Sequence, residues 1–308
     1  SFPAGASEEG ITAMPFRGLS AFPITPMDQH GRVRTDELAV LLRRLVEAGV
    51  DSVGLLGSTG SYMYLSRSER LRAIEAAAEA LSGRTPLIVS IGALRTDEAQ
   101  ALARDAEKAG ADGLLLAPVS YIPLTEEEVF QHFSAVAGTT GLPLCIYNNP
   151  ATTHFNFGNA LLQRLSGVPS IRAVKNPAPS AAEAQERHRA LQSMVPADFA
   201  IGYSGDWLAA DAVLAGGVAW YSVIGGLLPV PTLKLMRAAE AGDAAEVARL
   251  NERFQPLWAL FRELSSYRVV HAVANELGLT RADPPRPVLP LGAADRQRVM
   301  AAVAAIQA

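Results

Sequence analysis

The chain has 308 residues, of which 49% are hydrophobic and 19% are charged, and its formal net charge is −4. This length can bury a large core, and the composition is that of a soluble globular protein. The negative charge and the scattered arginines exclude a basic nucleic-acid-binding surface, and no apolar run approaches the roughly 20 residues that span a bilayer.

The first 16 residues lack a charged segment followed by an apolar one, so we interpret residues 1–16 as a flexible extension and not as a signal peptide. From about residue 18 to residue 230, short apolar segments alternate with longer amphipathic ones. The apolar segments are residues 19–25, 52–57, 86–92, 113–118, 143–147, 171–175, 199–203 and 218–223.

The amphipathic segments have helical spacing. Residues 35–49, 66–83 and 96–110 each begin with a residue that can cap a helix, namely Thr35, Ser66 and Thr96, and each end near a glycine. Eight units of strand and helix predict a (β/α)8 barrel over residues 17–230. A doubly wound open sheet is the alternative, weakened by the lack of G-x-G-x-x-G after the first strand.

The alternation stops beyond residue 231. The remaining sequence predicts a C-terminal helical region over residues 231–308, which packs on the barrel or on another subunit. Helices are expected in residues 231–242, 243–266, 267–278 and 292–307, and residues 281–290 ("RADPPRPVLP") read as a proline-stiffened connector.

Lys175 ends the sixth apolar segment ("IRAVKNP"), and it is unusual because only three of the 27 lysines and arginines are lysines. A guanidinium keeps its proton, whereas a buried ammonium can lose it and attack a carbonyl. Strand alternation places Ile171, Ala173 and Lys175 on one face. A lysine that merely reaches solvent from a strand end is the structural alternative.

Other candidates follow strand ends, where barrels of this class carry their reacting groups. Gly57 and Gly60 flank Ser58 and Thr59 in "GSTGS", a turn whose backbone amides could bind a carboxylate. Tyr147 ends the fifth apolar segment. Its phenol could carry protons in a reaction, or its ring could simply fill the core. These short patterns are weak when taken singly.

Other chemistries have less support. The five histidines show no paired spacing that is typical of metal ligands, so no metal or other cofactor is predicted. No G-x-S-x-G motif indicates a serine hydrolase. The single cysteine, Cys145, excludes an internal disulfide, fits a reducing and therefore cytoplasmic compartment, and reads as a buried apolar residue.

At these positions the chain resembles the dihydrodipicolinate synthase and N-acetylneuraminate lyase family of Schiff-base lyases. The resemblance extends from residues 18–31 ("GLSAFPITPMDQHG") to the helical C-terminal region. It includes "GSTG" at 57–60, "YNNP" at 147–150, Lys175 at the end of the sixth strand and "SGD" at 204–206. The resemblance implies a (β/α)8 barrel and a homo-oligomer, a dimer of dimers.

The resemblance also implies site residues. Lys175 would form an imine with pyruvate or another 2-oxo acid, and Tyr147 would donate and accept protons. Thr59 would bind the carboxylate and join Tyr147 in a relay, with Ser58 supplying the adjoining hydroxyl. Further substrate-binding positions are Gly57, Gly60, Gly205, Tyr221, Thr152 and Tyr121.

Three departures from the family pattern bear on the second substrate. Thr152 stands where the synthases carry an arginine that binds aspartate semialdehyde, and Ser61 stands where the family has a carboxylate. Ser120 occupies the relay position that a neighbouring subunit's tyrosine fills in the family, with Tyr121 one residue beyond. Whether Tyr121 substitutes is open.

The sequence thus predicts a cofactor-free lyase acting on a small-molecule 2-oxo acid, with a 2-oxo-3-deoxy sugar acid or a related hydroxylated or aromatic molecule as partner. Two alternatives stay open. One is a true 4-hydroxy-tetrahydrodipicolinate synthase, which joins pyruvate to aspartate semialdehyde. The other is a non-enzymatic 2-oxo acid sensor.

Overall fold

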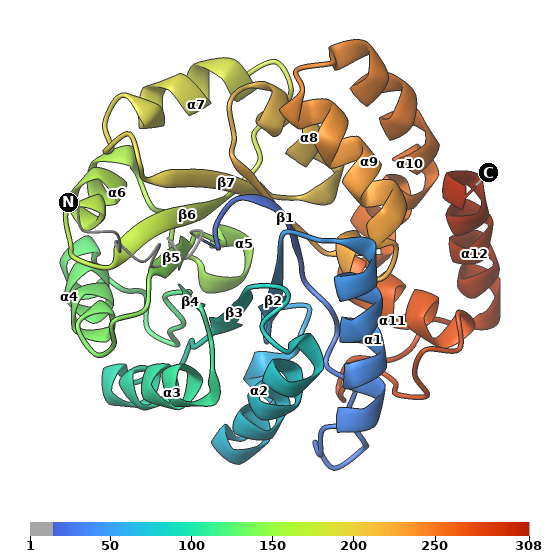
Figure 1. Cartoon of the computed structure of the whole chain (residues 1–308), viewed down its shortest axis with the longest axis horizontal. Helices are drawn as coiled ribbons and strands as arrows, with labels where there is room; N and C mark the ends of the chain where they lie inside the picture. Colours follow the sequence, from blue (N-terminus) through green and yellow to red (C-terminus); the bar gives the residue numbers. More distant parts are fainter. Residues whose placement is uncertain (1–14, 308) are drawn as a thin grey trace, which may run out of the picture.

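A computed structural model describes residues 15–307 and contains eight parallel strands closed into one barrel. The strands pair in chain order, and β8 returns to β1 (Figure 1). The (β/α)8 barrel is confirmed, and the doubly wound alternative is wrong. The strands are β1 Gly18–Ala21, β2 Ser52–Leu55, β3 Leu87–Ser90, β4 Gly113–Leu116, β5 Leu144–Tyr147, β6 Ile171–Pro177, β7 Ala200–Ser204 and β8 Ala219–Ser222.

Helices connect successive strands, as parallel pairing requires, and they form a ring outside the barrel (Figure 1). Of the predicted extension over residues 1–16, residues 1–14 lie outside the described residues. The helices up to the end of the ring are α1 Thr35–Ala48, α2 Arg67–Leu81, α3 Thr96–Ala109, α4 Glu126–Ala137, α5 Pro150–Thr153, α6 Asn159–Ser166, α7 Ala184–Gln192, α8 Asp206–Leu214 and α9 Pro229–Glu240.

Some of the residues predicted to begin or end helices α1, α2 and α3 do so in the structure, and others do not. Gly49 and Gly110 adopt the left-handed conformation that closes α1 and α3, and the Ser66 hydroxyl caps α2. Thr35 and Thr96 do not cap: each is the first helical residue, and the arginine before it takes the cap position without a capping hydrogen bond. A helical pattern alone does not separate these two adjacent positions.

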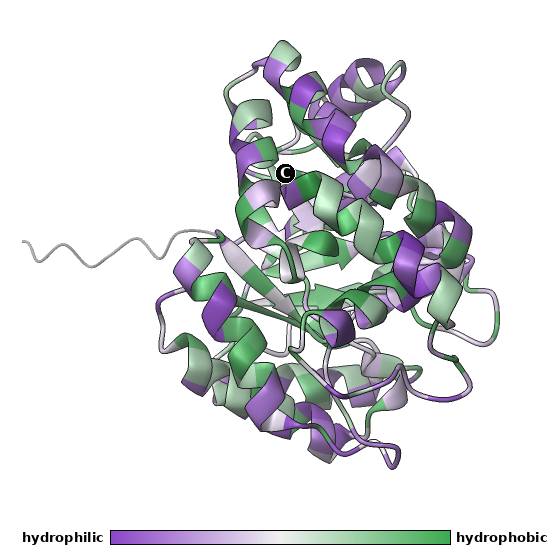
Figure 2. Ribbon diagram, turned by 90° about the vertical axis from the view of Figure 1, so that its right-hand side faces the viewer, coloured by the Kyte–Doolittle hydropathy of each residue, from purple (hydrophilic) through white to green (hydrophobic). Residues whose placement is uncertain are grey.

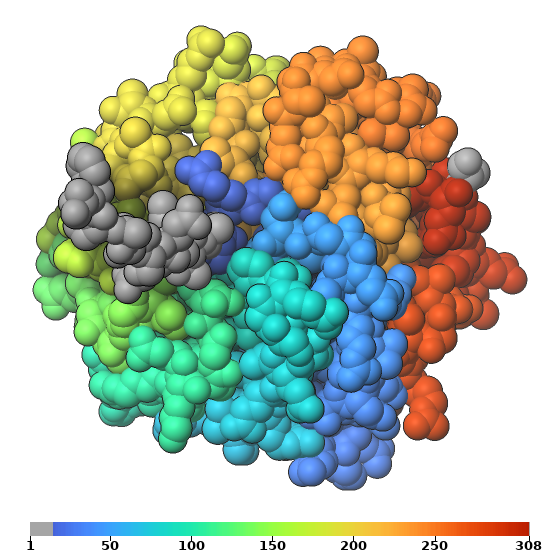
Figure 3. Space-filling model, viewed as in Figure 1, coloured from blue at the N-terminus to red at the C-terminus, as the bar shows by residue number. Residues whose placement is uncertain are grey.

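The C-terminal region divides into one ring helix and a separate layer. α9 packs against α8, α1 and β1, so it takes the eighth place in the ring. α10 Ala244–Leu264, α11 Ser266–Glu276 and α12 Ala293–Gln307 pack on one another beside it. Figure 1 shows α12 outside the ring of helices, and in Figure 3 the orange-red to red atoms of α11 and α12 lie along the right-hand edge of the molecule. The division at residue 230 stays a prediction, and the place of α9 favours a boundary near residue 242.

The connector over residues 281–290 is confirmed, because this segment contains no helix or strand. It joins α11 to α12. Figure 2 shows hydrophilic colouring along much of the outer helix surfaces and paler or hydrophobic colouring on the strands, as a barrel buried by its helices requires.

Side chains fill the barrel interior. A second hydrophobic cluster lies there, separate from the core between strands and helices, and it contains Ala173, two residues before Lys175. Ile171 instead joins the outer core. The prediction that it shares a face with Ala173 and Lys175 is wrong, because the pairing of β5 with β6 shifts register between Leu144 and Cys145.

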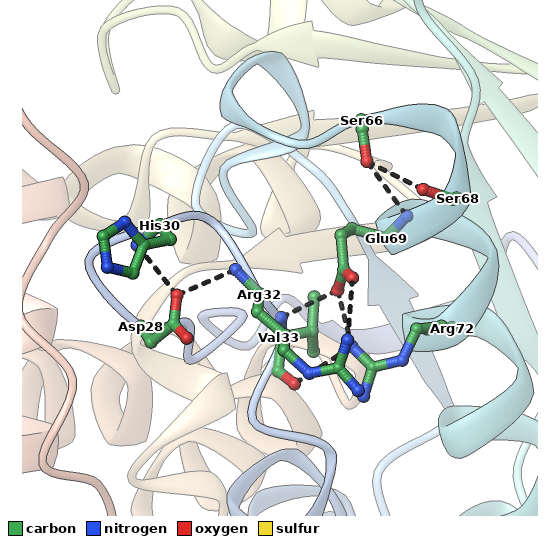
Figure 4. A network of polar contacts seen from close by, with 8 residues as sticks. All are labelled: Asp28, His30, Arg32, Val33, Ser66, Ser68, Glu69 and Arg72. Atoms are coloured by element: carbon green, nitrogen blue, oxygen red, sulfur yellow. Dashed lines mark hydrogen bonds and ion pairs between the residues drawn. The ribbon is translucent and has the colours of Figure 1, made fainter.

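The loop between β1 and α1 is tied to the start of α2 by a polar network (Figure 4). The Glu69 carboxylate accepts hydrogen bonds from the Val33 amide at 2.8 Å and from the Arg72 guanidinium at 2.6 Å. Asp28 accepts two backbone amides within the same loop. These contacts fix the loop on the side of the barrel where β1 ends, close to the predicted site.

Candidate active site

Lys175 lies at the carboxyl end of β6 and is 5% exposed. Its Nζ atom lies 3.9 Å from the ring centre of Tyr147, 4.3 Å from that of Phe22 and 5.9 Å from that of Tyr221. No acidic side chain among residues 15–307 forms an ion pair with it. The amine is therefore held by aromatic faces and opens into a cavity, whereas a lysine that merely reaches solvent would be exposed.

Glycines make room for the rings around the amine. A Cβ atom on Gly54 would lie 2.2 Å from the Phe22 ring, and one on Gly202 would lie 2.5 Å from the Tyr221 ring. Neither contact is sterically possible for a real side chain, so glycine is needed at both positions. Phe22 was not predicted as a site residue, although it stands in the quoted "GLSAFPITPM" segment.

Tyr147 pairs with Lys175 across β5 and β6, which brings the phenol and the amine to the same strand end. The Ser58 hydroxyl lies 3.2 Å from the phenol oxygen, and the Asn149 amide donates a hydrogen bond to it at 3.0 Å. No hydrogen bond joins Thr59 to Tyr147 within residues 15–307. Of the two predicted hydroxyls, the one that contacts the phenol is thus that of Ser58.

The segment after β2 forms a tight turn beside these groups. Leu56 and Ser61 have positive φ angles of 59° and 61°, and a Cβ atom on Gly60 would lie 2.8 Å from the Leu56 Cα atom. In the described part of the chain, the backbone amides of Ser58 and Thr59 donate no hydrogen bond. Free amides in such a turn can bind an anion, as predicted from the "GSTGS" sequence.

Asp206, the last residue of the "SGD" motif, is buried and holds the turn that follows β8. Its carboxylate accepts hydrogen bonds from the Trp220 indole at 2.8 Å, the Ile224 amide at 2.8 Å and the Val223 amide at 3.3 Å. Burial raises the pKa of the Asp206 carboxyl, and these hydrogen bonds oppose the rise. The residue positions one wall of the cavity and was not predicted individually.

We expect Asp206→Asn to lower the free energy of unfolding by about 1–3 kcal/mol, because the new amide group would face buried N–H donors and leave one unpaired. Chemical unfolding followed by circular dichroism measures this loss. Asp97→Asn is the control, since Asp97 forms an exposed ion pair with Arg95 that contributes little to stability. Equal stability of the two variants would contradict the positioning role of Asp206.

The cavity above Lys175 has a volume of about 910 Å³ and extends to the C-terminal helices. Phe261, Ser265, Ser266 and Tyr267 line it, and the Tyr267 hydroxyl lies 2.6 Å from the hydroxyl of Ser61. No site was predicted in this region. The break in the helical pattern at "SS" was its signal: Ser265 has a φ angle of 75° where α10 meets α11.

Gly57 and Gly60 shape the turn after β2 and do not line the cavity, whereas the other four predicted residues line it at different depths. Gly205, with a φ angle of 89°, and the buried Tyr221 lie near the amine. Thr152 is exposed on α5. Tyr121 is 91% exposed, and neither it nor Ser120 is hydrogen-bonded to Tyr147 among residues 15–307; the Ser120 hydroxyl donates to the Ile122 carbonyl. Within residues 15–307, neither Ser120 nor Tyr121 therefore extends the predicted proton relay beyond Tyr147 and Ser58.

Cys145 lies in the barrel interior with its thiol 3.6 Å from the Tyr221 hydroxyl. Burial raises the pKa of the thiol to about 12, which is unfavourable for a nucleophile. No group of three or more His, Cys, Asp or Glu residues suited to a metal ion occurs within residues 15–307. None of the described helices is both long and apolar enough to cross a membrane.

The sequence and the structure of the chain were compared with those of known proteins. A model of the dihydrodipicolinate synthetase family matches residues 15–306. The chain belongs to the dihydrodipicolinate synthetase family. This confirms the resemblance on which the site residues were predicted, and it makes the protein a lyase of the aldolase type.

Members of the dihydrodipicolinate synthetase family resemble the chain over most of its length. The 4-hydroxy-tetrahydrodipicolinate synthase of Neisseria gonorrhoeae is 33% identical, covering 92% of this chain and 96% of its own. The structure of a dihydrodipicolinate synthase from Agrobacterium tumefaciens is 62% identical with a TM-score of 0.93, covering 95% and 98%. The chloride-inhibited synthase of Acinetobacter baumannii, solved with pyruvate, is 27% identical with a TM-score of 0.87, covering 95% and 99%.

Proposed function

We propose that the protein is a lyase in which Lys175 forms an imine with pyruvate or another 2-oxo acid, and which then makes or breaks a carbon–carbon bond or eliminates water. The placement of the Lys175 amine carries the proposal: it is buried among aromatic rings, lacks an acidic partner within the described chain and lies beside a phenol. The pyruvate complex of the Acinetobacter baumannii relative supports the choice of keto acid.

The chemistry balances without a cofactor. The Lys175 amine adds to the ketone carbon, and the ketone oxygen leaves as water to give a protonated imine. The imine withdraws electrons from the neighbouring carbon, which loses a proton and becomes nucleophilic. That carbon bonds to the carbonyl carbon of an aldehyde, whose oxygen takes up a proton. Water then hydrolyses the imine, and the reverse sequence cleaves the bond.

Tyr147 is the proton carrier in this proposal. The hydrogen bond from Asn149 holds its phenol oxygen in place, and the Ser58 hydroxyl offers the next step of a relay. The free amides of Ser58 and Thr59 would hold the keto acid carboxylate. The role of Thr59 in the relay is carried over from the family alone, since its hydroxyl does not contact Tyr147.

For the second substrate, the family resemblance and Thr152 favour a 2-oxo-3-deoxy sugar acid or a related molecule over aspartate semialdehyde. A true 4-hydroxy-tetrahydrodipicolinate synthase is the second candidate, favoured by the name of the Neisseria gonorrhoeae relative. A coupled assay with pyruvate and aspartate semialdehyde tests it, and a flat trace would remove it. Assembly as a dimer of dimers and a cytoplasmic location are further proposals that rest on the family and on Cys145.

Reduction with borohydride in the presence of pyruvate tests the proposal. We expect a stable adduct, and peptide mapping should place it on Lys175 and not on Lys108 or Lys234, the other lysines of the chain. An adduct without turnover of any aldehyde or sugar acid would indicate a keto acid sensor. If intact mass spectrometry finds no adduct with any keto acid, the imine mechanism is wrong.

A further inference from the structure

We infer that the aldehyde that joins the keto acid in the carbon–carbon step is uncharged, because within residues 15–307 the lining of the cavity supplies no cation besides Lys175. A 2-oxo-3-deoxy sugar acid agrees with this inference as the joined product, since its carboxylate is the one that the keto acid brings. The inference rests on the proposed imine chemistry, and it specifies in addition whether the partner molecule carries a charge. It depends on three observations: the charged residues of the cavity, the use that the keto acid makes of them, and the character of the remaining walls.

Among the described residues that line the cavity, the charged side chains are those of Lys175 and Asp206. Asp206 is negative when ionised, and its carboxylate already accepts the Trp220, Val223 and Ile224 hydrogen bonds. The other lining residues carry no charge: they are aromatic or aliphatic residues, glycine, proline, methionine, and residues with hydroxyl or amide groups. Lys175 is therefore the cation that substrates meet in this part of the chain.

The keto acid uses that cation. Its carboxylate, bound at the amides of Ser58 and Thr59, balances the positive imine on Lys175. A carboxylate or phosphate on the second substrate would then lie in the cavity without a partner, which is unfavourable. Arg70 does not line the cavity: its guanidinium is buried, donates to the Gly92 carbonyl at 2.9 Å and lies 5.2 Å from the Tyr62 ring centre.

The outer walls suit a neutral molecule with an apolar body. Tyr62, Tyr64, Trp207, Phe261 and Tyr267 come from three separate parts of the chain to line the cavity. None of these five side chains carries a charge at neutral pH, because phenols ionise only at about pH 10 and the other rings do not ionise. A cavity of about 910 Å³ accepts a partner much larger than pyruvate itself.

Pairs of aldehydes that differ in charge and little else test the inference. Suitable pairs are butanal with succinic semialdehyde, benzaldehyde with para-carboxybenzaldehyde, and glyceraldehyde with its phosphate ester. Each is offered to the wild-type protein together with pyruvate, and the aldol product is quantified by chromatography. We expect kcat/KM for the neutral member to exceed that for the charged member by about tenfold or more in every pair that reacts.

Thr152→Arg supplies the missing cation, because Thr152 is exposed and lines the cavity near its mouth. We expect this variant to raise kcat/KM for the charged aldehydes by about tenfold or more, the factor that a charge-assisted hydrogen bond provides. Ala160→Arg is the matched control. It adds the same charge on the exposed surface of α6, outside the cavity, and should leave the ratio within each pair unchanged.

The outcomes separate this inference from the proposed function. If borohydride labels Lys175 but the charged aldehydes react as well as their neutral counterparts, the inference is overturned and the imine mechanism stands. The absence of any label would instead overturn the mechanism. An unchanged ratio in Thr152→Arg would contradict the view that a missing cation sets the preference.

Discussion

Lys175→Arg is expected to abolish turnover and to leave no adduct after borohydride reduction in the presence of pyruvate. The guanidinium keeps the positive charge and much of the length of the side chain, but it does not provide a free amine that can add to a ketone. Because the imine is the electron sink for every later step, activity should fall to the level of the uncatalysed reaction. Product formation and intact mass, measured on the same sample, check both effects.

Lys108→Arg is the matched control for this variant. Lys108 is exposed in the last turn of α3 and is not among the residues that line the cavity, so the same exchange should leave turnover and labelling unchanged. Thermal unfolding of both variants excludes misfolding as the cause of lost activity. Clear turnover by Lys175→Arg would mean that another group performs the chemistry.

Tyr147→Phe is expected to lower kcat by about 10²–10⁴-fold, the range that general acid–base groups contribute. The ring against the Lys175 amine is kept, while the hydroxyl that meets Ser58 and Asn149 is removed. Keto acid binding should change less than kcat, because the phenylalanine preserves the shape of the site. Steady-state kinetics with a reactive aldehyde separates the two parameters.

Tyr203→Phe is the control for the loss of a buried phenol. The Tyr203 hydroxyl lies 2.8 Å from His188 Nδ1, and the residue does not line the cavity. This variant should lose stability and keep kcat. If both tyrosine variants reduce kcat to the same extent, the effect on Tyr147 is structural and its role as the proton carrier is wrong.

The fold was predictable because its signals are repeated. Eight apolar segments of strand length, separated by amphipathic ones, leave few arrangements other than a closed parallel barrel. What failed was local: Ile171 was placed on the wrong face because strand alternation does not reveal a register shift. At Thr35 and Thr96 the prediction was also displaced by one residue, because it placed the helix cap on the residue that is the first of the helix.

The site was predictable where its residues follow strand ends, as with Lys175, Tyr147 and the turn at Ser58. It was not predictable where tertiary packing brings distant segments together. Tyr267 follows the break between two helical segments, a signal that does not indicate which part of the barrel it meets, and its contact with Ser61 joins positions about two hundred residues apart.

The packed barrel interior has a consequence for the order of events. Cys145 and Ala173 belong to the packed cluster inside the barrel and do not line the cavity, so molecules reach the amine from the open end of the barrel. In the proposed mechanism, the keto acid and its partner would share one passage, and the keto acid would have to enter first. An excess of aldehyde would occupy the passage before the amine has reacted, and it should slow the cycle and not accelerate it.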